Sequence, residues 1–220
     1  MNSKRIKSVL TDNRAGQIGS SIFIILSGLG VAIVGAGLVL WWRKLTKSTF
    51  KSLGLYKPES LIRTIMLGVF LGLLIKFVFV SLVMPALGSV PAANSPFSFL
   101  KGNLTNALLF SIYVIVVGGF SEELIFRGFL YRQAEGWFGS SKTSLVLMVI
   151  IGSLIFGLPH IYQGGFGVVQ SILVGMIYGT MYLVNKRNLW MVMIAHAVFD
   201  LFSIYIIYND LSTVMNSMFF

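Results

Sequence analysis

Residues 18–42 read IGSSIFIILSGLGVAIVGAGLVLWW, and none of these side chains is charged. A helix of about 20 apolar residues already crosses the ~30 Å hydrocarbon core of a bilayer, so this segment is long enough to span it with some tilt. Trp41 and Trp42 end the run and Arg43 follows, which is typical of an anchor at the membrane interface. A cleaved signal peptide has a shorter apolar core, so we expect the segment to be retained.

Five further apolar runs predict further spans, at residues 64–87, 104–120, 144–158, 166–184 and 189–208. The third run is short unless its helix continues to Tyr131, and the absence of proline there allows this. The fold class is therefore all-α, a polytopic transmembrane helical bundle of about six spans. Glycines one turn apart, Gly68 with Gly72 and Gly175 with Gly179, predict close helix contacts.

The domain organisation follows from the same runs. Residues 1–63 are expected to hold a basic segment, the first span and a basic interfacial linker, residues 64–208 the membrane core, and residues 209–220 a short tail. No soluble domain or internal repeat is apparent.

The composition excludes several classes of protein. Of the 220 residues, 56% are hydrophobic and 11% are charged. A soluble domain carries roughly 25% charged residues, more than twice as many. There is no cysteine, which excludes disulfides, thiol catalysis and cysteine-bound metal.

The net charge of +10 comes from basic residues that flank the apolar runs. This arrangement is typical of membrane proteins and not of nucleic-acid binding. If these basic loops are cytoplasmic, spans two to six alternate consistently, while the basic residues before the first span fit poorly.

Three acidic residues and both histidines lie within or at the edge of apolar runs: Glu122, Glu123, Asp200, His160 and His196. The two histidines are the only ones in the chain, and the three carboxylates are among seven acidic residues. An ionisable side chain at membrane depth costs on the order of 3 kcal/mol, so it is normally retained for a partner or a function.

Glu122 and Glu123 are adjacent, so on a helix they point about 100° apart. Glu123 lies one turn before Arg127, and we predict an ion pair between these two. Glu122 is left without a local partner, in an apolar setting suited to a carboxylate that acts as a general base. The alternative is that both glutamates only pair with basic residues of neighbouring helices.

The histidines supply two more elements. His160 follows Pro159 at the end of the fourth run, where a histidine is either a hydrogen-bonded helix terminus or part of a site. His196 and Asp200 are one turn apart on one helix face, a spacing that suits a carboxylate orienting an imidazole, two donors for a substrate oxygen, or two metal ligands. Together with Glu122, these residues favour hydrolysis by activated water. The zinc motif His-Glu-x-x-His is absent, so the spacing indicates no metal.

One geometric condition must hold for these residues to meet. At about 1.5 Å per residue of helix, Glu122 lies about 15 Å from Arg132, but His160 lies about 27 Å from Lys142. The fourth helix must therefore begin well outside the membrane or tilt steeply. Lys76, in the middle of the second run, either neutralises a site carboxylate, reaches the interface with its long side chain, or pairs with a packing partner.

The chain resembles the CPBP family of intramembrane proteases, which includes CAAX prenyl proteases and bacteriocin-processing enzymes and is also called the Abi family. Three motifs carry the resemblance: Glu122-Glu123-Leu-Ile-Phe-Arg127, Phe156-x-x-x-His160 and His196-x-x-x-Asp200. The similar region runs from about Leu104 to Tyr208, and residues 1–50 contribute nothing to it.

The resemblance implies an intramembrane endopeptidase that cleaves a peptide bond near the membrane surface. By analogy, Glu122 and His160 activate water, while His196 and Asp200 stabilise the oxyanion. The family motif commonly ends in Asn, so Asp200 must be protonated to donate, or else it orients His196. No cofactor is required in this mechanism. Zinc is possible, and Glu122, His160 and His196 would then be its ligands.

The expected partners and location follow from the same resemblance. The substrate is expected to be a peptide or a lipidated protein: a prenylated carboxy-terminal motif, a bacteriocin leader or a signalling-peptide precursor. Membrane lipid surrounds the protein, no nucleic acid is expected, and the oligomeric state stays open. We expect a multi-pass protein of the bacterial cell membrane.

Two other functions stay open from the sequence. The chain could be a noncatalytic membrane scaffold or regulator that binds a partner such as a sensor kinase and keeps the polar residues for folding. It could also be a transporter that uses Glu122 and His160 as a proton relay, although the absence of paired inverted repeats argues against this.

Overall fold

The computed structural model describes residues 25–88 and 96–211, and these residues form helices and their connections without a β-strand. Five helical stretches are long and apolar enough to cross a membrane: Ile25–Leu45, Leu61–Ala86, Leu104–Phe138, Lys142–Val184 and Leu189–Tyr208. The chain is therefore an integral multi-pass membrane protein. Residues 18–24 of the first predicted span, and most of the predicted tail, lie outside the described residues.

The stretch from Lys142 to Val184 is a helical hairpin. It consists of α7 (Lys142–Gly157), a short 3₁₀ turn η7 (Leu158–Gln163) and α8 (Gly164–Val184). A Cβ added at Gly157 would meet Ile172, and one at Gly175 would meet Ser153, so the two arms run antiparallel. Because this stretch contains two arms, the prediction of about six spans is confirmed.

The other stretches are divided by changes in helix type. Their parts are η1 (Val31–Ala36) and α2 (Gly37–Leu45); α3 (Leu61–Val78), η3 (Phe79–Val83) and α4 (Met84–Ala86); α5 (Leu104–Val114), η5 (Ile115–Glu122), η6 (Leu124–Leu130) and α6 (Tyr131–Phe138); and α9 (Leu189–Tyr208). The predicted continuation of the third run is present and extends to Phe138. The segments η5 and η6 have the wide π-helical geometry that often occurs at functional sites.

Polar caps fix where the long helices begin. The side chains of Ser60, Asn103, Ser141 and Asn188 each accept a hydrogen bond from a backbone N–H in the first turn of α3, α5, α7 and α9 respectively. Such caps satisfy N–H groups that have no partner inside the helix. The apolar runs therefore begin where the sequence also supplies a cap.

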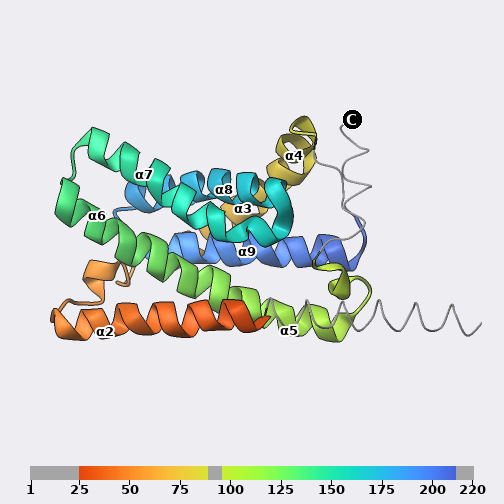
Figure 1. Cartoon of the computed structure of the whole chain (residues 1–220), viewed down its shortest axis with the longest axis horizontal. Helices are drawn as coiled ribbons and strands as arrows, with labels where there is room; N and C mark the ends of the chain where they lie inside the picture. The colour runs from red at the N-terminus through yellow and green to blue at the C-terminus, as the bar shows by residue number, and fades with distance from the viewer. Residues whose placement is uncertain (1–24, 89–95, 212–220) are drawn as a thin grey trace, which may run out of the picture.

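Helix α9 lies at the centre of the bundle and packs along α3 (Figure 1). A Cβ at Gly68 would meet Ile194, and one at Gly72 would meet Ala195 and Val198, so α3 and α9 run parallel with their backbones in close approach. The predicted contact at this glycine pair is confirmed. The second glycine pair also lies at a helix contact, since Gly175 packs against α7 and Gly179 packs against Tyr131 of α6.

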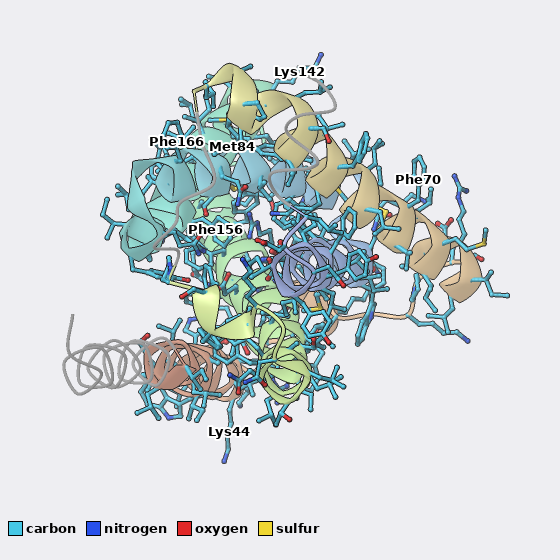
Figure 2. All side chains as sticks on the ribbon, turned by 90° about the vertical axis from the view of Figure 1, so that its right-hand side faces the viewer. Lys44, Phe70, Met84, Lys142, Phe156 and Phe166 are labelled. Carbon is cyan, nitrogen blue, oxygen red and sulfur yellow. The ribbon has the colours of Figure 1, made fainter. Side chains whose placement is uncertain are left out.

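Large apolar side chains cover the outside of the bundle. Phe70 is 59% exposed and points away from the other helices, whereas Phe156 is 2% exposed and points into the interior (Figure 2). Exposed side chains of this kind occur on α2, α3, α5 and α7. Such a surface is suited to lipid and would be unfavourable in water.

The basic loops meet at one end of the bundle. Arg187 forms an ion pair with Glu135 of α6, and the hydroxyl of Tyr56 donates to the carbonyl of Lys186 at 2.7 Å. The first contact joins α6, and the second joins the connection between α2 and α3, to the turn between α8 and α9. The clustering is the one expected of loops on a single side of the membrane.

Candidate active site

The four residues predicted to take part in hydrolysis line one cavity in the structure. Glu122 from η5, His160 from η7, and His196 with Asp200 from α9 all line one cavity of about 250 Å³. The cavity lies inside the membrane core, between α3, η5, η7 and α9. Its remaining lining is mostly aromatic and aliphatic, with a few polar side chains: Lys76, Tyr162, Gln163, Gln170, Ser171 and Ser203.

The depth of His160 is explained by the length of α6 and α7. A Cβ at Gly152 would meet the ring of Tyr131, so these two residues lie at the same level. Glu122 precedes Tyr131, and His160 follows Gly152, by a little over two helical turns each. The two residues therefore lie a similar number of turns from that level. The turn between α6 and α7 extends beyond the turn between α8 and α9 (Figure 1), so the fourth helix begins far out, as the sequence required.

Glu123 forms the centre of a buried polar network. Its Oε1 accepts a hydrogen bond from Nη1 of Arg127 at 2.8 Å and lies 2.7 Å from Nδ1 of His196. Glu123 and Arg127 are 0% and 1% exposed. Arg127 also donates to the carbonyl of Gly175 at 3.2 Å and stacks over the ring of Phe156 at 4.3 Å. The predicted ion pair is present, and it joins three segments of the chain.

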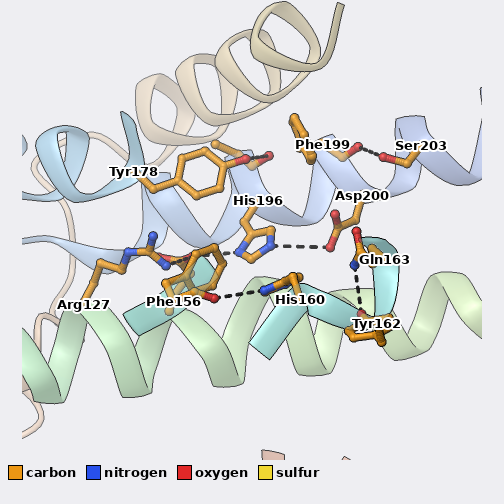
Figure 3. Close-up of polar contacts among 12 residues, drawn as sticks. Arg127, Phe156, His160, Tyr162, Gln163, Tyr178, His196, Phe199, Asp200 and Ser203 are labelled. Carbon is orange, nitrogen blue, oxygen red and sulfur yellow. Dashed lines mark hydrogen bonds and ion pairs between the residues drawn. The ribbon is translucent and has the colours of Figure 1, made fainter. Parts of the chain in front are cut away.

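His196 is held between two carboxylates (Figure 3). Its Nε2 lies 3.5 Å from Oδ2 of Asp200, while Nδ1 faces Glu123. An ionised carboxylate only accepts hydrogen bonds, so His196 donates from Nδ1 to Glu123. The imidazole is thus oriented by Glu123, and Nε2 is directed at Asp200 and the cavity.

His160 is oriented by the backbone of its own segment. Its Nδ1 lies 2.9 Å from the carbonyl oxygen of Phe156, as Figure 3 shows. A carbonyl can only accept, so Nδ1 carries the hydrogen and Nε2 of the neutral ring keeps its lone pair. A histidine in this state can accept a proton from water.

Glu122 differs from its neighbour Glu123. Within residues 25–88 and 96–211, the carboxylate of Glu122 has no hydrogen bond or ion pair, and it faces the cavity. Gly118, one turn earlier, leaves room for the α9 side chains to approach: a Cβ there would lie 2.8 Å from Oδ2 of Asp200 and 3.4 Å from Nε2 of His196.

We therefore expect Gly118→Ala to lower the rate of the reaction at the site and to leave the stability of the fold unchanged. Alanine is a better helix former than glycine, but its methyl group would push Asp200 and His196 away from Glu122. A displacement of about 1 Å can cost on the order of 100-fold in rate. The matched control is Gly136→Ala on α6, where a Cβ meets no atom within 4 Å. Peptide cleavage and thermal unfolding of both variants are the measurements, and an unchanged rate in Gly118→Ala would contradict the expectation.

Sequence reasoning missed one feature of the site and left a second open. The bond between Glu123 and His196 joins residues 73 positions apart, and no local pattern signals it. Lys76 lines the cavity, and the interpretation that it reaches the interface is wrong. It is 7% exposed, and its Nζ lies 4.5 Å from the centre of the Phe199 ring.

The predicted zinc ligands do not form a metal site in this geometry. Among the described residues, no three His, Asp or Glu side chains are grouped so that they could hold a metal ion. Both nitrogens of His196 face carboxylates, and Nδ1 of His160 faces a carbonyl. These contacts use three of the four histidine ring nitrogens, and a catalytic zinc usually has three protein ligands.

The chain is a multi-pass membrane protein, and ionisable side chains line a cavity between its helices. The family described as type II CAAX prenyl endopeptidase Rce1-like matches residues 104–202. This match to the CAAX protease family confirms the resemblance drawn from the three motifs. The matched range contains Glu122, His160, His196 and Asp200 and supports a protease. No match was found among curated proteins or among solved structures.

Proposed function

We propose that the protein is an intramembrane endopeptidase that hydrolyses a peptide bond near the membrane surface with water activated by Glu122. The observation that carries the proposal is the single cavity lined by Glu122, His160, His196 and Asp200, which come from three separate segments. Among the described residues, Glu122 has no hydrogen-bond or ion-pair partner, and it shares the cavity with His160, whose Nε2 keeps a lone pair. This arrangement is expected of a site that binds and deprotonates water.

The proposed step begins with a water molecule between Glu122 and His160. Its oxygen attacks the carbonyl carbon of the peptide bond, while its proton passes to the carboxylate of Glu122, assisted by Nε2 of His160. The C–N bond then breaks, and the proton is delivered to the departing amine nitrogen. The products are a new carboxyl end and a new amino end, so no oxidant or covalent enzyme intermediate is needed.

His196 is proposed to stabilise the negative oxygen that forms during this attack, together with Asp200 when that side chain is protonated and can donate. With a hydrogen on each ring nitrogen, His196 donates to Glu123 through Nδ1 and presents Nε2–H to the cavity. Glu123 then acts as a positioning residue, because it fixes the ring without facing the cavity. Donors fixed in place before the reaction usually make a large contribution to stabilising such a charge.

The substrate is proposed to be a peptide or a lipidated protein at the membrane. The family match supports a CAAX type of substrate, and a bacteriocin leader or another peptide precursor stays a prediction. Placement in a bacterial cell membrane is also a prediction. In each case the peptide bond must reach a cavity inside the helical bundle.

The proposal is tested by hydrolysis in water enriched in the heavy oxygen isotope. Peptides that accumulate in cells containing the protein, but not in cells with Glu122→Gln, identify candidate substrates, which are then incubated with purified protein. We expect the carboxylate formed at the cleaved bond to gain one heavy oxygen, and the original carboxyl end of the peptide to gain none. Absence of cleavage, with a cellular phenotype that survives Glu122→Gln and His160→Ala, would instead support a noncatalytic scaffold or regulator.

Removal of metal is expected to leave the activity unchanged. The described side chains offer no set of three ligands, and the proposed step uses only protein groups and water. Purified protein dialysed against a strong chelator should therefore cleave its peptide at the untreated rate. A loss of activity that returns on addition of zinc would contradict the proposed mechanism, and metal content measured on the same preparations decides between the two.

A further inference from the structure

Lys76 is a cation in the cavity that the proposed hydrolysis does not use. It lies on α3 in the middle of a membrane-spanning stretch and is 7% exposed. Among the described residues that line the cavity, it is the only lysine or arginine. An ionisable side chain at this depth is costly and is normally retained for a partner or a function. The packing of α3 on α9 places this lysine near a carboxylate.

The side chain of Lys76 is on the face of α3 that packs against α9. Gly72 lies one turn before it, and a Cβ there would meet Ala195. Phe79 lies about one turn after it, and its ring packs edge-on against the ring of Phe199, with 6.4 Å between the ring centres. Residues three to four positions apart on a helix share one face, so Lys76 also faces α9. Its ammonium accordingly lies 4.5 Å from the centre of the Phe199 ring.

Asp200 is the carboxylate whose charge acts on Lys76. It follows Phe199 on α9 and lines the same cavity as the lysine. Its Oδ2 lies 3.5 Å from Nε2 of His196, to which it is directed in Figure 3. Lys76 and Asp200 attract each other electrostatically. They do not form a direct ion pair in the described part of the chain, so this attraction acts over a longer distance than that of a direct pair.

The charges of the described site balance only when Lys76 is included. Three carboxylates belong to the cavity and to the polar network beside it: Glu122, Glu123 and Asp200. Three cations accompany them when His196 carries a hydrogen on each ring nitrogen: Lys76, Arg127 and His196. Arg127 neutralises Glu123, and His196 is shared by two carboxylates. Without Lys76, one buried negative charge would lack a positive counterpart, which is strongly unfavourable inside a protein.

We propose that Lys76 is the counter-ion of Asp200 and that the two residues together position His196 for hydrolysis. This inference rests on the proposed function and adds a positioning residue to it. With Lys76 present, Asp200 stays a carboxylate and attracts the hydrogen on Nε2 of His196. Both nitrogens of the ring then face carboxylates, and the ring is fixed with its positive charge at the cavity. In this form Asp200 acts on the oxyanion through His196 and does not itself donate.

A double-mutant cycle on peptide hydrolysis tests the positioning role. Lys76→Met removes the charge and leaves Asp200 without its counter-ion. We expect kcat to fall by about 100-fold, as for a group displaced by about 1 Å, while KM changes little. Asp200→Asn removes the opposite charge and should also lower kcat. The double variant contains neither charge, so it should cleave about tenfold faster than Lys76→Met alone, or better.

The exposed pair of Lys101 with Asp210 is the matched control. Its Nζ and Oδ2 are 2.6 Å apart, and the two side chains are 57% and 60% accessible. The same substitutions there, Lys101→Met and Asp210→Asn, should each leave the rate within a factor of about two, and their effects should add. Lys76→Arg keeps the charge and should stay closer to the wild-type rate than Lys76→Met.

Thermal unfolding of the same variants tests the pairing without any need for cleavage. Lys76→Met and Asp200→Asn should each lower the unfolding temperature, because each leaves one buried charge without its counterpart. The double variant should unfold at a higher temperature than either single variant. Effects that simply add would overturn the pairing. Coupling of Lys76→Met to Phe199→Leu in place of Asp200→Asn would also overturn it, because the partner of the lysine would then be the ring.

The two measurements together separate the inference from the function on which it rests. If the unfolding temperatures show coupling but Lys76→Met cleaves with the wild-type kcat, the positioning role is overturned. A double variant no faster than Lys76→Met also overturns that role. If the unfolding temperatures show coupling and the wild-type protein cleaves no peptide, the pair of Lys76 with Asp200 stands and the proposed hydrolysis fails.

Discussion

Glu122→Gln is expected to lower the rate of peptide hydrolysis by about 10²–10⁴-fold, the usual contribution of a general base. Glutamine has the shape of glutamate but cannot take the proton of the attacking water. Because Glu122 has no hydrogen bond or ion pair in the described part of the chain, its replacement should leave the fold and substrate binding intact. Single-turnover cleavage by purified protein is the measurement, so that loss of the chemical step is separated from loss of binding.

The matched control for this variant is Glu59→Gln. Glu59 lies in the loop before α3, and its side chain is 85% exposed in its pair with Lys186. The same chemical change there should leave the rate within a factor of about two, because exposed pairs contribute little. A Glu122→Gln protein that cleaves at the wild-type rate would remove Glu122 from the mechanism and leave the cavity without its proposed base.

The second large effect is expected on stability. Arg127→Met should destabilise the protein by about 3–5 kcal/mol, the usual result of removing one partner from a buried ion pair. In this variant Glu123 stays fully buried. Its Oε1 keeps the hydrogen bond to His196 and loses the one to Arg127. Reversible unfolding of the purified protein in mixed detergent micelles measures the loss. A change below about 1 kcal/mol would show that the pair does not hold the helices together.

Two further variants test whether this loss of stability comes from the buried ion pair. Lys101→Met breaks the pair with Asp210, in which both side chains are more than half exposed. Loss of such an exposed pair should cost at most about 1 kcal/mol. Replacing Glu123 together with Arg127 by methionine removes both buried charges. Since apolar pairs often substitute well for a buried ion pair, this double variant should be more stable than Arg127→Met alone.

Much of the fold was predictable because lipid imposes a simple pattern on the sequence. The last predicted run, 189–208, has the same bounds as α9 (Leu189–Tyr208). The extension of the third run to Phe138 was not predicted beyond Tyr131, since α6 carries polar residues and no longer resembles a membrane span. Its helix is held there by a tertiary contact, the ion pair of Glu135 with Arg187, which no local pattern indicates.

The candidate site was predictable for a related reason. Ionisable side chains are rare in apolar helices, so Glu122, His160, His196 and Asp200 stood out individually, and the structure places them at one cavity. What the sequence could not indicate was the direction of each side chain. Glu123 was assigned only to Arg127, although it also holds His196, and Lys76 could not be distinguished from a lysine that reaches the headgroups.

The central position of α9 has a consequence for how the protein matures. This helix packs on α3, η5 and α8, and it supplies both His196 and Asp200. Because the ribosome makes it after all the helices that it contacts, the nascent chain lacks half of its hydrolytic residues until α9 has left the translocon. Under the proposed function, newly inserted and incomplete copies are therefore expected to be inactive, and hydrolysis is expected to begin only when biosynthesis of the membrane core has finished.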